Sequence, residues 1–180
     1  MEQTNLHSIL AAKEERSARI EHLLGDGSFS LVAATMNIPG PRKSTNLINR
    51  AFDLALQDLL VEFGCSHLFL LHKESGLAGP YALFLIKDTI QPLQMKARLV
   101  AFENTHPIGR WLDLDVYLKK GTVLGRDDLA LPRRRCFLCD EEATVCRRTA
   151  KHSLEQVCAF TEQNLQAYVQ TSGIHHPNSL

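Results

Sequence analysis

The stretch from Trp111 to Leu118 constrains the fold most, because apolar and other residues alternate along it without a break. Leucine or valine stands at every second position, and Asp113 and Asp115 stand between them. Strict alternation predicts a β-strand with one buried face. The two carboxylates then project together from the other face, about 7 Å apart at the backbone. We therefore expect a strand with a row of apolar residues on one face and both acids on the other.

The other segments predict an α+β domain. Apolar spacing and capping residues predict helices, whereas short apolar runs bounded by Gly, Pro or Asn predict strands. Residues 93–103 satisfy neither period cleanly, and Pro92 at a first turn favours a helix. The expected helices are 8–24, 44–63, 93–103 and 153–169, and the further strands are 29–36, 67–71, 81–86 and 122–124. We expect one domain over residues 1–180, with a mixed sheet flanked by helices and a disordered tail at 172–180.

Charge and hydropathy exclude several classes of protein. Hydrophobic residues make up 44% and charged residues 22% of the chain, which is typical of a globular domain. Basic and acidic residues balance at 20 each, so no net charge draws the chain to nucleic acid or to an anionic membrane. We expect no nucleic-acid partner and no membrane association. The absence of a signal-like or membrane-spanning apolar run favours the cytoplasm.

The carboxylate pair at Asp113 and Asp115 is suited to hold a hard cation. Magnesium binds through one or two carboxylates together with substrate phosphates, so this spacing on a strand suits triphosphate chemistry. The neighbouring Gly109 would let a phosphate approach the backbone. The alternative is that the two acids only mark the wet face of an amphipathic strand. A glycine followed by such a strand resembles the polymerase-β-like nucleotidyltransferases.

Longer motifs resemble one family. They are residues 103–116, which include Gly-Arg-Trp-Leu-Asp-Leu-Asp-Val, then Leu-Pro-Arg-Arg-Arg-Cys at 131–136 with Cys139 and Cys146, and Pro-Gly-Pro-Arg-Lys at 39–43. Together they closely resemble the apo-citrate lyase phosphoribosyl-dephospho-CoA transferase family. The resemblance runs in order from about Ala11 to Tyr168.

The resemblance implies a reaction. Members transfer phosphoribosyl-dephospho-CoA from its triphosphate precursor to a serine of the citrate lyase acyl carrier protein, the gamma subunit, and release pyrophosphate. Asp113 and Asp115 would then hold Mg²⁺ at the donor's phosphates. Glu103 and Asp128 are the candidates for a third carboxylate, although either can be a capping or surface acid.

Four further residues are candidates for substrate binding. Arg110 and Lys43 can contact phosphate oxygens, although both residue types usually lie on solvated surface. His106 has a side chain that titrates near neutral pH, but Thr105-His106-Pro107 is also an ordinary turn sequence. Asn37 can bind the nucleotide or cap a loop.

A Cys-rich segment at 133–152 contains the ligand set of a Cys₃His zinc site. Cys136, Cys139, Cys146 and His152 provide three thiolates and an imidazole, with a knuckle spacing between the first two. The thiols can instead be small buried hydrophobes, or take part in redox chemistry. Neighbouring arginines, among them Arg133, Arg134 and Arg135, can contact the donor's phosphates or an acidic carrier protein.

Two other functions are compatible with these features. The malonate decarboxylase system attaches the same prosthetic group to another carrier, but the Leu-Pro-Arg-Arg-Arg-Cys motif resembles the citrate lyase branch better. A non-catalytic interaction module stabilised by zinc would need the cysteines and His152 and would not need Asp113.

Overall fold

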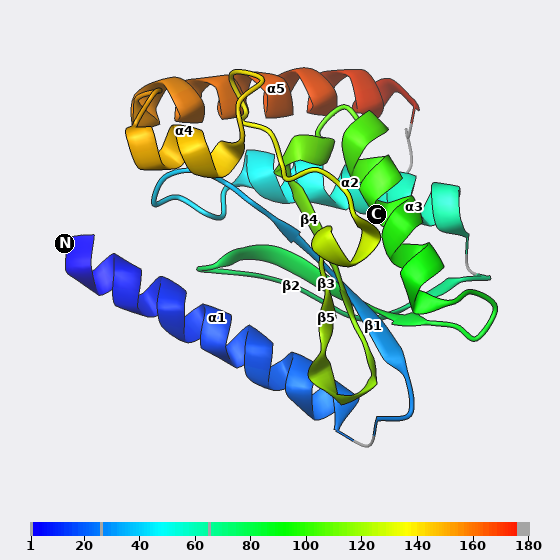
Figure 1. The fold of residues 1–180 in the computed structure, drawn as a ribbon. Coiled ribbons are helices and arrows are strands. Elements are labelled where there is room, and N and C mark those ends of the chain that lie inside the picture. The colour runs from blue at the N-terminus through cyan, green and yellow to red at the C-terminus, as the bar shows by residue number, and fades with distance from the viewer. Residues whose placement is uncertain (1, 26, 65, 176–180) are drawn as a thin grey trace.

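The computed structural model describes residues 2–25, 27–64 and 66–175. Within these ranges lie five α-helices and five β-strands (Figure 1). The helices are α1 (Glu2–Leu24), α2 (Asn46–Phe63), α3 (Pro92–Thr105), α4 (Ala143–Thr149) and α5 (Leu154–His175). The strands are β1 (Ser30–Met36), β2 (Leu68–Gly76), β3 (Gly79–Ile86), β4 (Leu112–Tyr117) and β5 (Val123–Leu124). The α+β class predicted from the sequence is confirmed.

The strands form one sheet in the order β2-β3-β1-β4-β5, and every neighbouring pair is antiparallel. The expectation of a mixed sheet is therefore wrong. The connection from β1 through α2 leads to β2, which is separated from β1 by β3. The connection from β3 through α3 leads to β4, which is separated from β3 by β1. Since each helical connection passes over one strand, the parallel partners never become neighbours.

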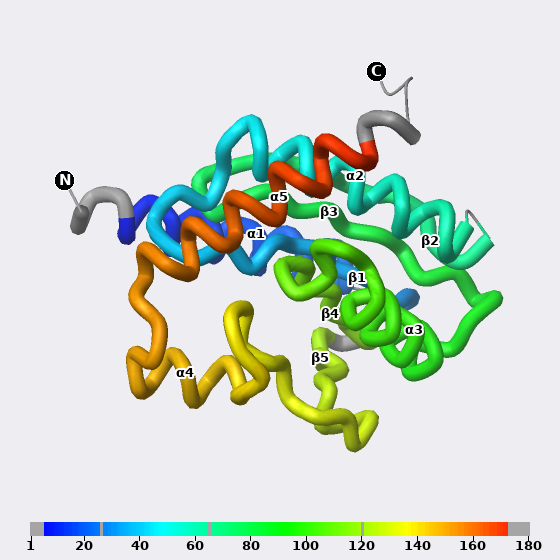
Figure 2. The backbone as a smooth tube through the Cα atoms, turned by 90° about the horizontal axis from the view of Figure 1, so that it is seen from above, coloured from blue at the N-terminus to red at the C-terminus, as the bar shows by residue number. Residues whose placement is uncertain are grey.

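Each face of the sheet has its own core, because β1 is buried on both faces. Val32 and Ala34 face a large core formed with α2, α3 and α5. Leu31 and Ala33 point the other way and pack under α1 with Ile20 and other apolar side chains. Figures 1 and 2 show the helices in two layers, with α1 crossing one face of the sheet and α2, α3 and α5 on the other. Because α1 packs over β1, β3 and Tyr117, it leaves the other residues of that face of β4 partly accessible.

Side-chain caps fix where the long helices begin. Thr45 Oγ1 accepts the Ile48 N–H at 3.2 Å. Ser153 and Gln156 form the predicted capping box, with bonds of 2.9 and 3.1 Å. Residues 92–105 are helical, as favoured above. Helix α5 continues to His175, so the disorder expected at 172–180 is wrong for residues 172–175, and residues 176–180 lie outside the described residues. None of the helices described here is both long and apolar enough to cross a membrane.

Candidate active site

The outer edge of β4 is only partly covered by another strand. Strand β1 pairs with β4 along its whole length, whereas β5 pairs only with Val116 and Tyr117. The outward backbone groups of Leu112 and Leu114 are therefore left without a strand partner. Charged side chains take the place of that partner. The bonds are Lys96 Nζ to Leu114 O at 2.8 Å, Leu114 N to Glu103 Oε1 at 2.9 Å, and Arg134 Nη1 to Leu112 O at 2.7 Å.

The same side chains reach the two aspartates. Arg134 Nη2 lies 2.8 Å from Asp113 Oδ1 and 2.7 Å from Glu103 Oε1. Lys96 Nζ lies 3.4 Å from Asp115 Oδ1. We call Lys96, Glu103, Arg126 and Arg134 the charged edge. It connects the backbone of β4 to the carboxylate pair.

Asp113 and Asp115 lie on one face of β4, as the alternation predicted. Their side chains are 41% and 39% exposed, while Leu112, Leu114 and Val116 between and beside them are buried. Burial raises the pKa of Asp115, and the neighbouring charge of Asp113 raises it further, while Lys96 opposes the shift. Two close acids with access to solvent form a site that a cation would stabilise.

Glu103 has both carboxylate oxygens occupied. Its side chain is 1% exposed; Oε1 accepts from Leu114 N and Arg134, and Oε2 lies 2.6 Å from Arg126 Nη2. Burial raises its pKa, against the effect of the two guanidinium groups and the Leu114 N–H. This arrangement favours a positioning role over a third metal-ligating carboxylate. Asp128 accepts the Gly125 N–H at 2.7 Å and so caps a turn.

Beside the charged edge lies a cavity of about 310 Å³, which we call the arginine pocket. It brings together four of the candidate residues, namely Asn37, Glu103, Gly109 and Arg110. Five arginines line it: Arg110, Arg126, Arg133, Arg134 and Arg135. Because Arg134 also contacts Asp113, the pocket adjoins the carboxylate pair. Such a concentration of guanidinium groups is suited to phosphate.

Two of the pocket residues, Gly109 and Arg110, have structural roles that the sequence did not indicate. A Cβ at Gly109 would lie 2.2 Å from the Glu103 carbonyl oxygen, so glycine is required for the chain to pass α3 closely. Arg110 Nη1 donates to the carbonyl oxygens of Cys136 and Phe137, at 2.8 and 3.2 Å. Arg110 therefore holds the Cys-rich segment against the start of β4.

His106 and Lys43 do not line the arginine pocket. The His106 side chain is 5% exposed; Nδ1 accepts from Ile108 N at 3.3 Å, and Nε2 lies 3.0 Å from Asp58 Oδ2. Burial lowers its pKa, which favours a neutral ring with the proton on Nε2. Lys43 Nζ donates to Ile38 O, and burial lowers its pKa. His106 thus connects α3 to α2, while Lys43 secures the loop after β1.

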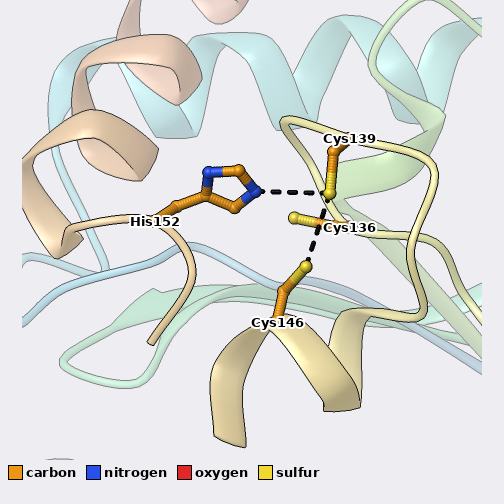
Figure 3. Close-up of side chains that lie close together, drawn as sticks. All are labelled: Cys136, Cys139, Cys146 and His152. Carbon is orange, nitrogen blue, oxygen red and sulfur yellow. Dashed lines mark hydrogen bonds between the residues drawn. The ribbon is translucent and has the colours of Figure 1, made fainter. Parts of the chain in front are cut away.

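The structure brings the predicted Cys₃His set together. The ligand atoms of Cys136, Cys139, Cys146 and His152 all lie within 4.8 Å of one another (Figure 3). This cluster could hold a structural metal. Among the described residues it is the only group of three or more His, Cys, Asp or Glu side chains arranged in this way. Asp113 and Asp115 would accordingly need water or substrate to complete a metal's coordination.

Sequence reasoning missed Lys96 and Arg126. Lys96 and Glu103 are seven residues apart and are buried with Leu99 on one face of α3. Two charged residues of opposite sign on an apolar helical stripe are a readable signal of a buried polar contact. Arg126 carries no comparable signal, because its segment is irregular in sequence.

Comparisons with known proteins identify the family of the chain. Residues 4–168 match the family described as "Apo-citrate lyase phosphoribosyl-dephospho-CoA transferase". A protein of Streptococcus pyogenes serotype M18 (strain MGAS8232), named as a probable member, is 39% identical over 93% of this chain and 88% of its own length. A protein of the same name from Vibrio cholerae serotype O1 (classical Ogawa 395) is 32% identical over 91% and 93%. The resemblance drawn from the motifs is confirmed.

Proposed function

The chain belongs to the apo-citrate lyase phosphoribosyl-dephospho-CoA transferase family, and we propose that it attaches this prosthetic group to the acyl carrier protein, the gamma subunit, of citrate lyase. The carrier's serine Oγ would form a bond to the phosphorus of the donor's triphosphate group that is attached to the ribose. The bond from that phosphorus to the leaving pyrophosphate would break. The observation that carries the proposal is the Asp113 and Asp115 pair beside the arginine pocket. We infer that the sheet is a polymerase-β-like nucleotidyltransferase core.

The residues fit a magnesium site. Asp113 and Asp115 offer hard oxygen ligands on one accessible face, and their mutual repulsion is relieved by a cation. When bound, Mg²⁺ would neutralise developing charge on the leaving pyrophosphate. Arg134 and Lys96 contact only the Oδ1 atom of each aspartate. These contacts fix the two carboxylates through Oδ1, and the Oδ2 atom of each is the oxygen proposed to bind the ion.

The arginine pocket is the proposed site for the donor's phosphates. Arg134 and Arg126 are committed to Glu103, at 2.7 and 2.6 Å. Arg133 and Arg135 are different, because both are 65% exposed and their ion pairs lie on the surface. Exposed pairs contribute little free energy, so these two guanidinium groups can exchange them for phosphate oxygens.

The test is the intact mass of the apo carrier protein after incubation with this enzyme, Mg²⁺ and triphosphoribosyl-dephospho-CoA. We expect the mass to rise by one prosthetic group as pyrophosphate appears. Asp113→Asn and Asp115→Asn should each lower kcat/KM on the order of 10³-fold, since several kcal/mol of charge stabilisation is lost. Asp88→Asn is the matched control, because Asp88 is exposed and lies outside the site.

Two outcomes would change the assignment. Modification of the malonate decarboxylase carrier in place of the citrate lyase carrier would move the enzyme to that system. No mass gain on either carrier with active donor would leave the Cys₃His cluster as the organising feature, as in an interaction module. Full activity in a folded Asp113→Asn variant would remove Asp113 from the proposed metal site. Exclusion of nucleic acid and a cytoplasmic location remain predictions.

A further inference from the structure

The four side chains of the Cys₃His cluster come from separate turns and meet in one place (Figure 3). Cys136 and Cys139 lie on the loop before α4, Cys146 lies on α4, and His152 lies in the link to α5. Cys139 Sγ is 3.4 Å from Cys146 Sγ and 3.3 Å from His152 Nε2. Ligands of a tetrahedral zinc, with Zn–S near 2.3 Å, are separated by about 3.3 to 3.8 Å. These two distances already match, and all four ligand atoms lie within 4.8 Å of one another, so a small contraction would complete the site.

The segment around the cluster has almost no apolar core of its own. Every residue from Arg133 to His152 is described, and only Cys136 and Cys146 among them are buried. Val145, which could have packed inward, is 42% exposed. A segment of this size whose buried side chains are two cysteines would gain stability from a metal link. The thiols form no disulfide, since the Cys136, Cys139 and Cys146 side chains are free.

Backbone contacts orient the ligands as in a metal knuckle. Leu138 N–H points at Cys136 Sγ at 3.5 Å, which stabilises negative charge on that sulfur. Cys136 N donates to Glu141 O at 2.7 Å and closes the loop. At the other end, Ala150 has a left-handed backbone (φ 48°) that ends α4 and turns the chain toward His152. The loops thus bring each ligand to the cluster.

We propose that Cys136, Cys139, Cys146 and His152 bind one Zn²⁺, and that this ion positions Arg134 on Asp113. Arg134 precedes Cys136 by two residues, so an ion that fixes Cys136 restrains the backbone from which the Arg134 guanidinium reaches Asp113. Arg110 holds the Cys136 carbonyl oxygen, and Phe137 stacks on Trp111 at 5.3 Å between ring centroids, next to the first residue of β4. The metal therefore acts on the transfer site through Arg134, which is a positioning residue.

Metal content tests the first part of the proposal, that the cluster binds one Zn²⁺. The full chain, purified under reducing conditions, should contain one zinc per chain by elemental analysis and native mass spectrometry. Co²⁺ added to the stripped protein should give the thiolate charge-transfer and ligand-field bands of a tetrahedral site. A chain that is zinc-free and gives no such bands overturns the proposal.

Single substitutions identify the ligands. Cys139→Ser and Cys146→Ser should each lose the stoichiometric zinc and the cobalt bands. Cys158→Ser is the matched control and should keep both, because Cys158 is a free thiol outside the cluster. If a Cys139→Ser chain with native circular dichroism keeps one tightly bound zinc, Cys139 is not a ligand and the site as proposed is wrong.

Hydrogen exchange tests the link to the active site. Stripping zinc should speed amide exchange in residues 131–142 and at Leu114, whose N–H is bonded to the Glu103 carboxylate beside Arg134. Exchange in β3 should stay unchanged. Equal exchange at Leu114 with and without zinc would overturn the positioning role while leaving the metal site intact. None of these three measurements uses the transfer reaction, so failure of the proposed function would be seen separately.

Discussion

The two halves of β4 solve the same problem in different ways. At Val116 and Tyr117 the outer edge of the strand is satisfied by the backbone of β5. At Leu112 and Leu114 it is satisfied by the charged edge. The half that carries Asp113 and Asp115 is the half whose outer edge has no strand partner. A backbone partner gives only neutral dipoles, whereas a side-chain partner also brings charge to the carboxylates.

The difference has a cost in desolvation. Lys96 and Glu103 are 3% and 1% exposed at the side chain, and charged groups are buried only when fully paired. Pairing with another strand would have satisfied the same backbone groups without the desolvation of charged side chains. We infer that the charged edge is retained because Arg134 and Lys96 hold the two carboxylates in place.

Removing Glu103 is expected to have the largest effect on stability. Glu103→Ala leaves the Leu114 N–H and two guanidinium groups without their acceptor, which should cost about 3–5 kcal/mol. Urea unfolding followed by circular dichroism measures this loss. Because Arg134 loses one of its anchors, the transfer rate should fall in the same variant even at temperatures where it is folded.

Glu103→Gln is the companion variant. Its amide oxygen can still accept from Leu114 N, while the charge facing Arg126 and Arg134 is gone. We expect a loss of stability between those of wild type and Glu103→Ala. If both variants are as stable as wild type, the charged edge does not substitute for a strand, and the contrast between the two halves of β4 fails.

A substitution in β5, which covers the other half of β4, should lower stability without lowering the activity of the folded enzyme. Leu124 is 9% exposed and belongs to the large core, so Leu124→Ala should cost about 2 kcal/mol, the low end for a buried leucine. The activity of the folded variant should stay near wild type, since β5 brings no charge to the aspartates. Val123→Ala, at a position 43% exposed, is the control and should change stability by less than about 0.5 kcal/mol. A drop in kcat for Leu124→Ala at full folding would show that both halves serve the site.

Most helices and strands could be predicted from the periodicity of apolar residues, because that periodicity follows from which side chains are buried. The alternation at 111–118 and the helical spacing at 44–63 correspond to β4 and α2. Sheet order was beyond reach, since it depends on helical connections that pass over a strand. That geometry leaves no local mark on the residues of β1 or β3.

The site divides in a similar way. The spacing of Asp113 and Asp115, and of the cysteines with His152, predicted clusters that the structure brings together. His106, Lys43 and Gly109 were interpreted from residue type alone, and each has a local structural contact. The contacts of Arg134 with Leu112, Glu103 and Asp113 cross 21 to 31 residues of sequence, so no pattern could show them.

The smallest expected effect is a pH shift, and it tests whether the charged edge acts on the aspartates at all. Lys96 opposes the burial and the Asp113 charge that raise the pKa of Asp115. Replacing the ammonium group by a methyl thioether in Lys96→Met removes that opposition, so the pKa of Asp115 should rise further. Because an ionised Asp115 is the form that binds a cation, activity is lost as pH falls through its pKa.

The acid limb of the kcat/KM profile should therefore lie at higher pH in Lys96→Met than in wild type, with thermal unfolding checking that the variant is folded. Lys73→Met is the matched control. Lys73 lies on β2, at the opposite edge of the sheet, and its Nζ is 2.6 Å from Asp53 Oδ1 on α2. Its acid limb should coincide with that of wild type. If the Lys96→Met limb also coincides, Lys96 only replaces a strand at Leu114 O, and charge from this edge reaches the carboxylate pair through Arg134 alone.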